Sequence, residues 1–300
     1  MGRVIVIGSI NVDQVALVEE RPKPGETVLA IGHRQLAGGK GANQAIAAAR
    51  AGADVLMVGR VGDDSGGAAY LRRLAAHGID VRHVQVSTER PTGTAFITVD
   101  ETRENTIVVV PGANSEVGAD WPENFPALTA QDVVVLQLEI PLPTVIRAAD
   151  LAHEAGARVV INVAPYAELP PATLALADPI VANEHEAMAL ADSGAGVGSL
   201  LMTLGPNGAV WDGIGAPAHD VPGGLVIDTT GAGDAFVGAL AAALAGGADH
   251  AGAVQAALAA GSEAVSYAGA QPDAALGPEW MSAGAAPADL AESNEGERFA

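Results

Sequence analysis

The chain alternates between short, unbroken apolar runs and longer segments rich in alanine and leucine. The apolar runs have the length of β-strands and stand at residues 4–8, 55–59, 133–138, 159–163, 179–183 and 200–205. The helix-like segments between and after them stand at residues 42–51, 66–77, 144–155 and 233–245. Runs of β-branched residues that are apolar at every position are typical of strands buried on both faces. The alternation predicts an α/β fold with a doubly wound, mainly parallel sheet flanked by helices.

Two segments follow a different pattern, in which apolar and polar residues alternate. This alternation predicts hairpins without helices at residues 14–37 and 93–110, and we expect these two segments to form a small β-sheet lid with one face covered. Ordinary edge hairpins are the alternative. The lid would be inserted into a main domain that spans residues 1–273. The tail at 274–300 is rich in Ala, Pro, Gly and acidic residues, which predicts a partly disordered segment.

The charge and composition narrow the classes of partner. With 15 basic and 36 acidic residues, the chain has a formal net charge of −21, which disfavours nucleic acid and anionic membranes. A phosphate site would therefore be built locally, from backbone amides, a lysine and a metal ion. The absence of cysteine excludes disulfides and thiolate metal sites. Because no apolar run approaches the roughly 18 residues of a membrane span and no signal-peptide pattern stands at the start, we expect a cytoplasmic protein.

Polar residues directly follow two of the predicted strands, at the end where open α/β sheets bind ligands. In "GSINVD" these are Asn11 and Asp13, and in "LQLEIP" the residue is Glu139. The first motif lacks the G-x-G-x-x-G pattern of a dinucleotide-binding oxidoreductase. Asn11 and Asp13 are either ligand contacts or an Asx-turn. Glu139 is either a solvent contact or an acceptor for sugar hydroxyls.

The motif "GGKGANQA" opens a predicted helix with three glycines around Lys40. Its spacing and the missing hydroxyl after the lysine distinguish it from a P-loop. The glycines would let the backbone approach a ligand closely at Gly39, with Lys40 and Asn43 as donors for hydroxyls or phosphate oxygens. A glycine-rich connection without a ligand is the alternative.

In "VANEHEA", an amide and a carboxylate follow a strand at a spacing of three residues. On a starting helix Asn183 and Glu186 share a face, where they could hold a hydrated Mg²⁺ against phosphates. An N-cap asparagine followed by first-turn acids is the alternative.

The motif "DTTGAGDAF" is the strongest signal for chemistry. We expect a strand to end near Asp228, Gly231 and Gly233 to free the backbone, and a helix to begin around Asp234. Free N–H groups at a helix start can stabilise a phosphoryl group in transfer, and a carboxylate beside them can take a proton from the attacking hydroxyl. A plain first-turn acid is the alternative, but it does not explain the glycines.

Together these motifs resemble the ribokinase family of ATP-dependent sugar kinases, the PfkB-type carbohydrate kinases. The resemblance runs from about residue 4 to "GAQP" at 269–272, and "GGKGANQA" and "DTTGAGDAF" correspond to the two signature regions of the family. Further motifs, "GSINVD", "NTIVVVPGAN" and "QLEIP", are most similar to the ribose-phosphorylating members. The resemblance implies transfer of phosphate from ATP to the 5-hydroxyl of D-ribose, with Mg²⁺ and a K⁺ activator, and a lid that closes over the sugar and pairs two subunits as a homodimer.

The resemblance also implies a role for each matching position. Asp234 would be the general base, and the amides of Gly231, Ala232, Gly233 and Asp234 would form the anion hole. The residues that would hold ribose are Asn11, Asp13, Gly39, Lys40, Asn43, Glu139 and Asp234. The residues that would bind the nucleotide are Asn183, Glu186, Thr203, Gly205, Gly208 and Gly233, with Glu186 also holding Mg²⁺ through water. The residues that would surround the monovalent cation are Asp228, Thr230, Ala264, Tyr267, Gly269 and Asp273.

Three alternatives to ribose phosphorylation stay open at this point. Deoxyribose or fructose could be the substrate, or the chain could be a non-catalytic sensor of sugar or nucleotide. A nucleoside is disfavoured, because the predicted lid offers only Phe96 as an aromatic surface for a base. The segment 187–199 is about 20 residues shorter than the family pattern, and family members can have a polar residue at the position of Leu258. The residues that would contact adenine are therefore left unassigned.

Overall fold

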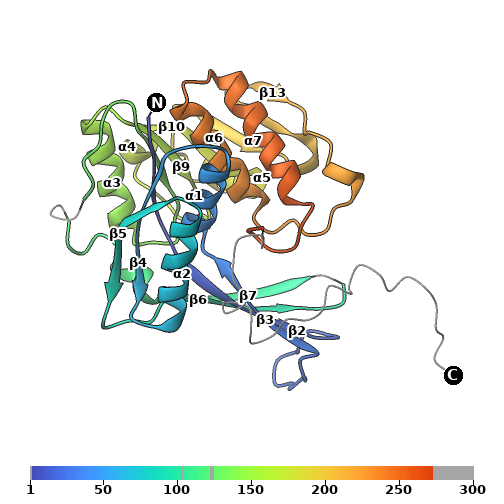
Figure 1. Cartoon of the computed structure of the whole chain (residues 1–300). Helices are drawn as coiled ribbons and strands as arrows, with labels where there is room; N and C mark the ends of the chain where they lie inside the picture. Colours follow the sequence, from blue (N-terminus) through green and yellow to red (C-terminus); the bar gives the residue numbers. More distant parts are fainter. Residues whose placement is uncertain (1, 103, 122–124, 273–300) are drawn as a thin grey trace.

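In the computed structural model, which describes residues 2–102, 104–121 and 125–272, a large sheet is covered by helices on both faces and a small sheet stands apart below it (Figure 1). The large sheet has nine strands, parallel from β11 to β5, with two antiparallel strands added at one edge. In spatial order they are β13 (Ile214–Ala216), β12 (Ala209–Trp211), β11 (Leu200–Thr203), β10 (Ala177–Asn183), β9 (Arg158–Asn162), β8 (Val133–Leu136), β1 (Val4–Ile7), β4 (Val55–Gly62) and β5 (Asp80–Ser87). The predicted α/β class and the mainly parallel sheet are confirmed.

All six apolar runs form strands of this sheet, and all four helix-like segments form helices. The helices are α1 (Lys40–Arg50), α2 (Ser65–Ala76), α3 (Leu142–Glu154), α4 (Pro171–Leu174), α5 (Glu184–Asp192), α6 (Ala232–Ala245) and α7 (His250–Ala264). The described part of the chain also forms the short 3-10 helices η1 (Gly112–Glu116), η2 (Gly205–Asn207) and η3 (Pro222–Gly224).

The core lies in two layers, one on each face of the large sheet. The four residues of β8 contribute alternately to the two layers. Val133 and Val135 pack with α1, α6 and α7, whereas Val134 and Leu136 pack with α3. Both faces are apolar, so the sequence reads as an unbroken run. Because the faces are covered, a ligand can approach the sheet only at the ends of its strands, and open α/β sheets bind ligands at the carboxyl ends.

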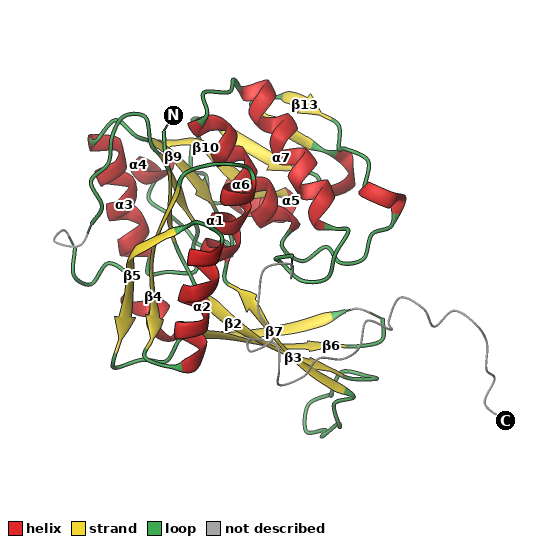
Figure 2. Cartoon of the chain, viewed as in Figure 1, coloured by secondary structure: helices red, strands yellow, loops and turns green. Residues whose placement is uncertain are grey.

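The small sheet has the strand order β3-β2-β6-β7 (Figure 2). Its strands are β2 (Asn11–Leu17), β3 (Gly32–Gly38), β6 (Gly93–Val99) and β7 (Asn105–Val110). β2 pairs in parallel with β6 and antiparallel with β3. β2 begins at Asn11, earlier than the predicted lid, so Asn11 and Asp13 belong to the small sheet itself. The separate small sheet is confirmed, in place of edge hairpins on the main sheet.

Two local expectations are wrong. Every residue of β7 is exposed, so the small sheet is not covered along this edge strand. The segment before the glycines of the strongest motif is not a strand: Ile227 N instead donates to Val265 O (2.8 Å), just after α7. The expected tail at 274–300 lies outside the described residues. None of the described helices is long and apolar enough to cross a membrane.

Candidate active site

Asp234 lies in the first turn of α6, directly after a left-handed residue. The φ of Gly231, the N-cap, is 77°, and a Cβ there would stand 2.5 Å from Ala270 Cα, so only glycine fits. N–H groups of a first helical turn have no acceptor within the helix. Ala232 N donates to Thr229 O (3.3 Å), so this amide serves the turn. The helix start thus offers donors beside a carboxylate that is only 7% exposed.

A cavity of about 120 Å³ joins Asp234 to the nucleotide-side candidates. The predicted site residues that line it are Lys40, Asn183, Glu186, Thr203, Gly231, Gly233 and Asp234. Ala232 is not among its lining residues, in keeping with its turn hydrogen bond. Gly205 and Gly208 also lie outside the lining, in and just after η2, which follows Thr203 at the end of β11.

The sugar-side candidates come from three separate elements. Glu139 Oε2 accepts hydrogen bonds from Ser9 Oγ (2.6 Å) and from Lys40 N (3.1 Å), which ties the end of β8 to the start of α1. The backbone at Gly39 passes so close to β2 that a Cβ would stand 2.7 Å from Asn11 N, at a φ of 87°. The fold therefore brings Asn11, Glu139 and Lys40 to one place.

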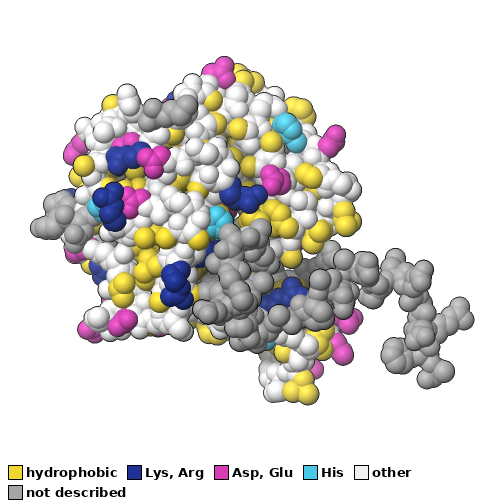
Figure 3. Space-filling model, in the orientation of Figure 1, with side chains coloured by type: hydrophobic (Ala, Val, Ile, Leu, Met, Phe, Trp, Pro, Cys, Tyr) yellow, Lys and Arg dark blue, Asp and Glu magenta, His cyan; other side chains and the backbone are white. Residues whose placement is uncertain are grey.

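The charges of the site residues also act on Asp13. Burial, and then the charges of Glu139 and Asp234, raise the pKa of Asp13 to about 7. Asp234 and then Glu139 and Glu186 raise the pKa of Lys40, against the opposing effect of burial. Lys40 therefore stays charged amid carboxylates from both sides of the site. Elsewhere, on the face drawn in Figure 3, Lys and Arg side chains are scattered and form no continuous patch.

Asn183 and Glu186 form the capping box that the sequence left open as an alternative. Asn183 Oδ1 accepts from Glu186 N (2.9 Å), and Glu186 Oε2 accepts from Asn183 N (2.8 Å). Both side chains also line the cavity, so the capping role and a ligand role are compatible in position. Within residues 2–102, 104–121 and 125–272, no three or more His, Asp or Glu side chains gather as a ready-made metal cage.

The predicted cation loops meet at Asp228. Its Oδ1 accepts from Thr230 N (2.9 Å) and its Oδ2 from Gly269 N (2.8 Å), so one carboxylate joins the loop before α6 to the loop after α7. Ala264 is the last residue of α7, and burial raises the pKa of the half-buried Tyr267. Asp273 lies outside the described residues.

Asn114, in η1, is a site-supporting residue that the sequence did not reveal. Its side chain is buried, accepts from Ile10 N (2.9 Å) and donates to Asn11 Oδ1 (2.7 Å). It stands in "PGAN" directly after β7, and this position after a strand was the available signal.

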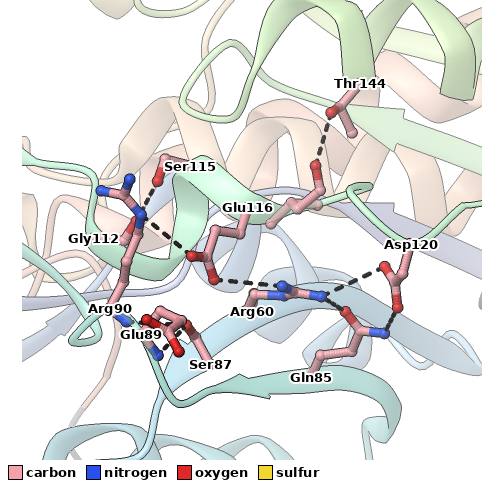
Figure 4. Close-up of polar contacts among 11 residues, drawn as sticks. Arg60, Gln85, Ser87, Glu89, Arg90, Gly112, Ser115, Glu116, Asp120 and Thr144 are labelled. Carbon is pink, nitrogen blue, oxygen red and sulfur yellow. Dashed lines mark hydrogen bonds and ion pairs between the residues drawn. The ribbon is translucent and has the colours of Figure 1, made fainter.

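A cluster of charged residues holds η1 from the other side (Figure 4). Glu116, the last residue of η1, accepts from Arg60 (3.4 Å) and pairs with Arg90 (3.2 Å). Arg60 also hydrogen-bonds Gln85 and lies 3.5 Å from Asp120. These contacts fix η1 against β4 and β5, and through Asn114 they support Asn11.

Three buried amides, one in contact with Asp234 and two in contact with that first amide, were also missed. They are Gln44 in α1, Gln137 after β8 and Asn162 at the end of β9. Gln137 and Asn162 each stand between apolar neighbours in sequence, and this was the available signal, because such groups are buried only with hydrogen-bond partners. Gln44 directly follows Asn43 and carries no such signal.

Comparison with known proteins gives a consistent result. The sequence model of the pfkB family of carbohydrate kinases matches residues 1–275. A ribokinase from Bacillus subtilis is 39% identical over 259 residues, which is 83% of this chain and 88% of that protein. A bifunctional ribokinase/ribose-5-phosphate isomerase A from Fructilactobacillus sanfranciscensis is 38% identical over 263 residues, 81% of this chain, and the match spans only 49% of that protein.

A solved structure extends the likeness to three dimensions. The Arabidopsis thaliana ribokinase complexed with ribose and ATP superposes with a TM-score of 0.78 at 31% identity, covering 90% of this chain and 95% of that one. The lid-bearing α/β architecture is therefore shared with an enzyme whose structure holds both a sugar and a nucleotide.

Proposed function

The chain belongs to the pfkB family of carbohydrate kinases, and we propose that it transfers the γ-phosphoryl group of ATP to the 5-hydroxyl of D-ribose, giving ribose 5-phosphate. The observation that carries this proposal is the place of Asp234. It stands between the amides of a helix start and the sugar-side residues, with Lys40 lining the same cavity. A base at this position can reach a hydroxyl whose oxygen faces the phosphoryl group.

In the proposed reaction Asp234 takes the proton of the sugar hydroxyl as its oxygen bonds to phosphorus, and ADP leaves. The amides of the first turn of α6 and the ammonium of Lys40 stabilise the negative charge of the transferring group. General-base assistance of this kind is worth roughly 10²–10⁴ in rate.

The sugar would be held by hydroxyl contacts from both sheets. Asn11 and Asp13 come from β2 of the lid, Glu139 from the segment after β8, and Lys40 and Asn43 from α1. Carboxylates and amides of this kind match the donors and acceptors of sugar hydroxyls. Closure of the small sheet would exclude water from the transfer.

The nucleotide would lie along the carboxyl ends of β10 and β11. Asn183 and Glu186 would face the phosphates, and Thr203, Gly205 and Gly208 would line the nucleotide. Mg²⁺, held through water by Glu186, would neutralise phosphate charge. A monovalent cation would sit beside the loops that Asp228 joins, and this joining of Thr230 and Gly269 supports the placement.

We further propose that the small sheet pairs two copies of the chain in the cytoplasm. The edge strand β7 exposes Ile107 by 50% and Val108 by 60%, and the neighbouring strand exposes Phe96 by 53%. An unpaired edge with exposed apolar side chains is a surface that proteins normally cover.

An ADP-release assay with a panel of sugars tests the proposed activity. We expect turnover with ribose above that with deoxyribose or fructose, and we expect Asp234→Asn to lower kcat by about 10²–10⁴ while ribose still binds. Ribose binding without ADP release would establish a sensor instead. Faster turnover with deoxyribose would move the substrate to that sugar, and near-normal turnover of Asp234→Asn would remove the base assignment.

A further inference from the structure

Both carboxylate oxygens of Asp234 accept hydrogen bonds from neighbouring amide side chains on α1. Asn43 Nδ2 donates to Oδ2 (2.8 Å), and Gln44 Nε2 donates to Oδ1 (2.9 Å). The helices α1 and α6 lie side by side in Figure 1, which brings these groups together. Asn43 already has a proposed role toward the sugar. Gln44, which is 0% exposed, has none.

The orientation of the Gln44 amide follows from its surroundings. Asn162 Nδ2 donates to the backbone oxygen of Val181 (3.2 Å), so Asn162 turns its oxygen toward Gln44. Gln44 Nε2 donates to this oxygen (3.1 Å) as well as to Asp234. Because two acceptors face one end of the amide, its NH₂ group must point there.

Gln137 closes the other end of the same amide. Its Nε2 donates to Gln44 Oε1 (2.6 Å), and Gln137 is also 0% exposed. Gln137 Oε1 has no hydrogen-bond partner among the described residues, so Gln137 can turn together with Gln44, but a turned Gln44 would place its oxygen against the carboxylate of Asp234 and against the side-chain oxygen of Asn162. Both contacts would be repulsive in a buried place, where unmatched polar groups are costly.

The Asn43 amide is oriented by a separate set of contacts. Its Oδ1 accepts from Gln271 Nε2 (2.7 Å), and Gln271 Oε1 accepts from Arg73 Nε (2.6 Å). Since Arg73 can only donate, the Gln271 amide has one allowed orientation, and this turns the NH₂ group of Asn43 toward Asp234. Two independent chains of amides therefore end on the two oxygens of one carboxylate.

We propose that Gln44 is a positioning residue for phosphoryl transfer, which holds Oδ1 of Asp234 in place, and that Gln137 supports Gln44 by donating a hydrogen bond to its side-chain oxygen. The inference rests on the proposed kinase function. Gln44 lies one residue from a proposed sugar contact but reaches the reaction only through Asp234. Its loss should therefore affect the chemical step more than sugar binding.

The test replaces Gln44 by Met, which keeps the approximate shape and removes both ends of the amide. We expect kcat for ribose phosphorylation to fall about 10- to 100-fold, since small displacements of a reacting group are costly, with the KM for ribose and for ATP changed less than about threefold. Gln137→Met should lower kcat less, with the same unchanged KM values. The double variant should match Gln44→Met alone, because Gln137 acts only through Gln44.

Asp132→Asn is the matched control, since Asp132 stands at the opposite end of β8 from Gln137. Asp132 is 2% exposed and hydrogen-bonds Arg3, so its replacement should lower Tm without changing kcat or KM. Circular dichroism and ribose calorimetry establish that each variant is folded. If Gln44→Met does not fold, the Gln137→Met measurements decide the question.

The possible results distinguish a failure of the positioning role of Gln44 from a failure of the proposed kinase function. A wild-type chain that does not phosphorylate ribose removes the proposed function. An active wild type in which Gln44→Met or, failing that, Gln137→Met keeps kcat within about twofold overturns the positioning role. An equal rise in KM, or strictly additive effects in the double variant, overturns it as well.

Discussion

The raised pKa of Asp13 predicts that ribose binding is coupled to the release of a proton. In the folded chain without sugar, partial burial of the carboxyl and then the charges of Glu139 and Asp234 raise the pKa of Asp13 to about 7. Sugar hydroxyls that donate to Asp13 would favour its ionised form. Binding should therefore displace the proton that Asp13 carries below pH 7.

The magnitude follows from the fraction of ionised Asp13. With a pKa of about 7, roughly nine chains in ten are ionised at pH 8 and roughly one in ten at pH 6. If only the ionised form binds well, the apparent Kd for ribose rises about tenfold from pH 8 to pH 6. Binding should release about half a proton at pH 7 and close to one at pH 6.

Isothermal titration calorimetry without ATP, in buffers of different ionisation enthalpy, measures both the Kd for ribose and the number of protons released. Ribose has no group that titrates in this range, so the proton comes from the protein. Asp13→Asn is the control: it should bind ribose more weakly, with a smaller dependence on pH and less proton release. A Kd that stays constant from pH 6 to pH 8, or proton release that survives in Asp13→Asn, would refute the reasoning.

The sign of the stability effect is opposite to that of an ordinary ion-paired aspartate. A folded pKa of about 7 against 3.8 means that the folded chain holds the proton to higher pH than the unfolded chain, so stability falls as pH rises through this window. The cost above pH 7 is at most on the order of 4 kcal/mol. Asp13→Asn should therefore have a higher Tm than the wild type at pH 8 and a similar Tm at pH 4.

Three further predictions concern the helix start, η1 and the lid. Gly231→Ala should lower stability by roughly 2–3 kcal/mol or more in denaturant melts, because of the positive φ of Gly231 and its close approach to Ala270. Gly233→Ala has open space around the added Cβ, so it should keep or slightly raise stability, yet lower kcat about tenfold or more. Equal stability losses in the two variants would contradict this. Glu116→Gln should weaken ribose binding up to about fivefold in calorimetry with kcat unchanged, whereas replacing the exposed Arg82 by Ala should change nothing; equal effects would count against support of η1. Val108→Glu should shift the chain from dimer to monomer in light scattering, and Met188→Glu, at a similar exposure in α5, should not; a wild type that is monomeric throughout removes the lid interface.

The sequence predicted the large sheet well because its strands are buried on both faces. Such strands must be apolar at every position, so runs such as the one at 133–138 stand out from their surroundings. The strand β5 was missed because it is an edge strand, in which polar residues such as Arg82 and Gln85 interrupt the pattern. The strands β12 and β13 have three residues each, too few to show a period.

The site was predictable where a motif sits directly after a strand or at a helix start. Lys40, Asn183, Glu186, Thr203 and Asp234 are far apart in sequence, yet they line one cavity because parallel strands end at one edge. The sequence could not decide between the capping and ligand roles of Asn183, because both need the same residue at the same place. Nor could it reveal Gln44 or Asn114, whose significance lies in contacts between residues about 100 or more positions apart.

The charge arrangement explains why a site with so many carboxylates suits a neutral sugar. The charges of Glu139 and Asp234 act on Asp13, and the charges of Asp234, Glu139 and Glu186 act on Lys40. An added anion at the sugar side would increase this repulsion, whereas hydroxyl groups supply hydrogen-bond donors without charge. Asp234 stands in the first turn of α6, and amides of such a turn would offer donors to a phosphoryl group. The proposed base, Asp234, would thus stand at the boundary between a region that needs donors without charge and a region that attracts an anion, as transfer from ATP to a sugar hydroxyl requires.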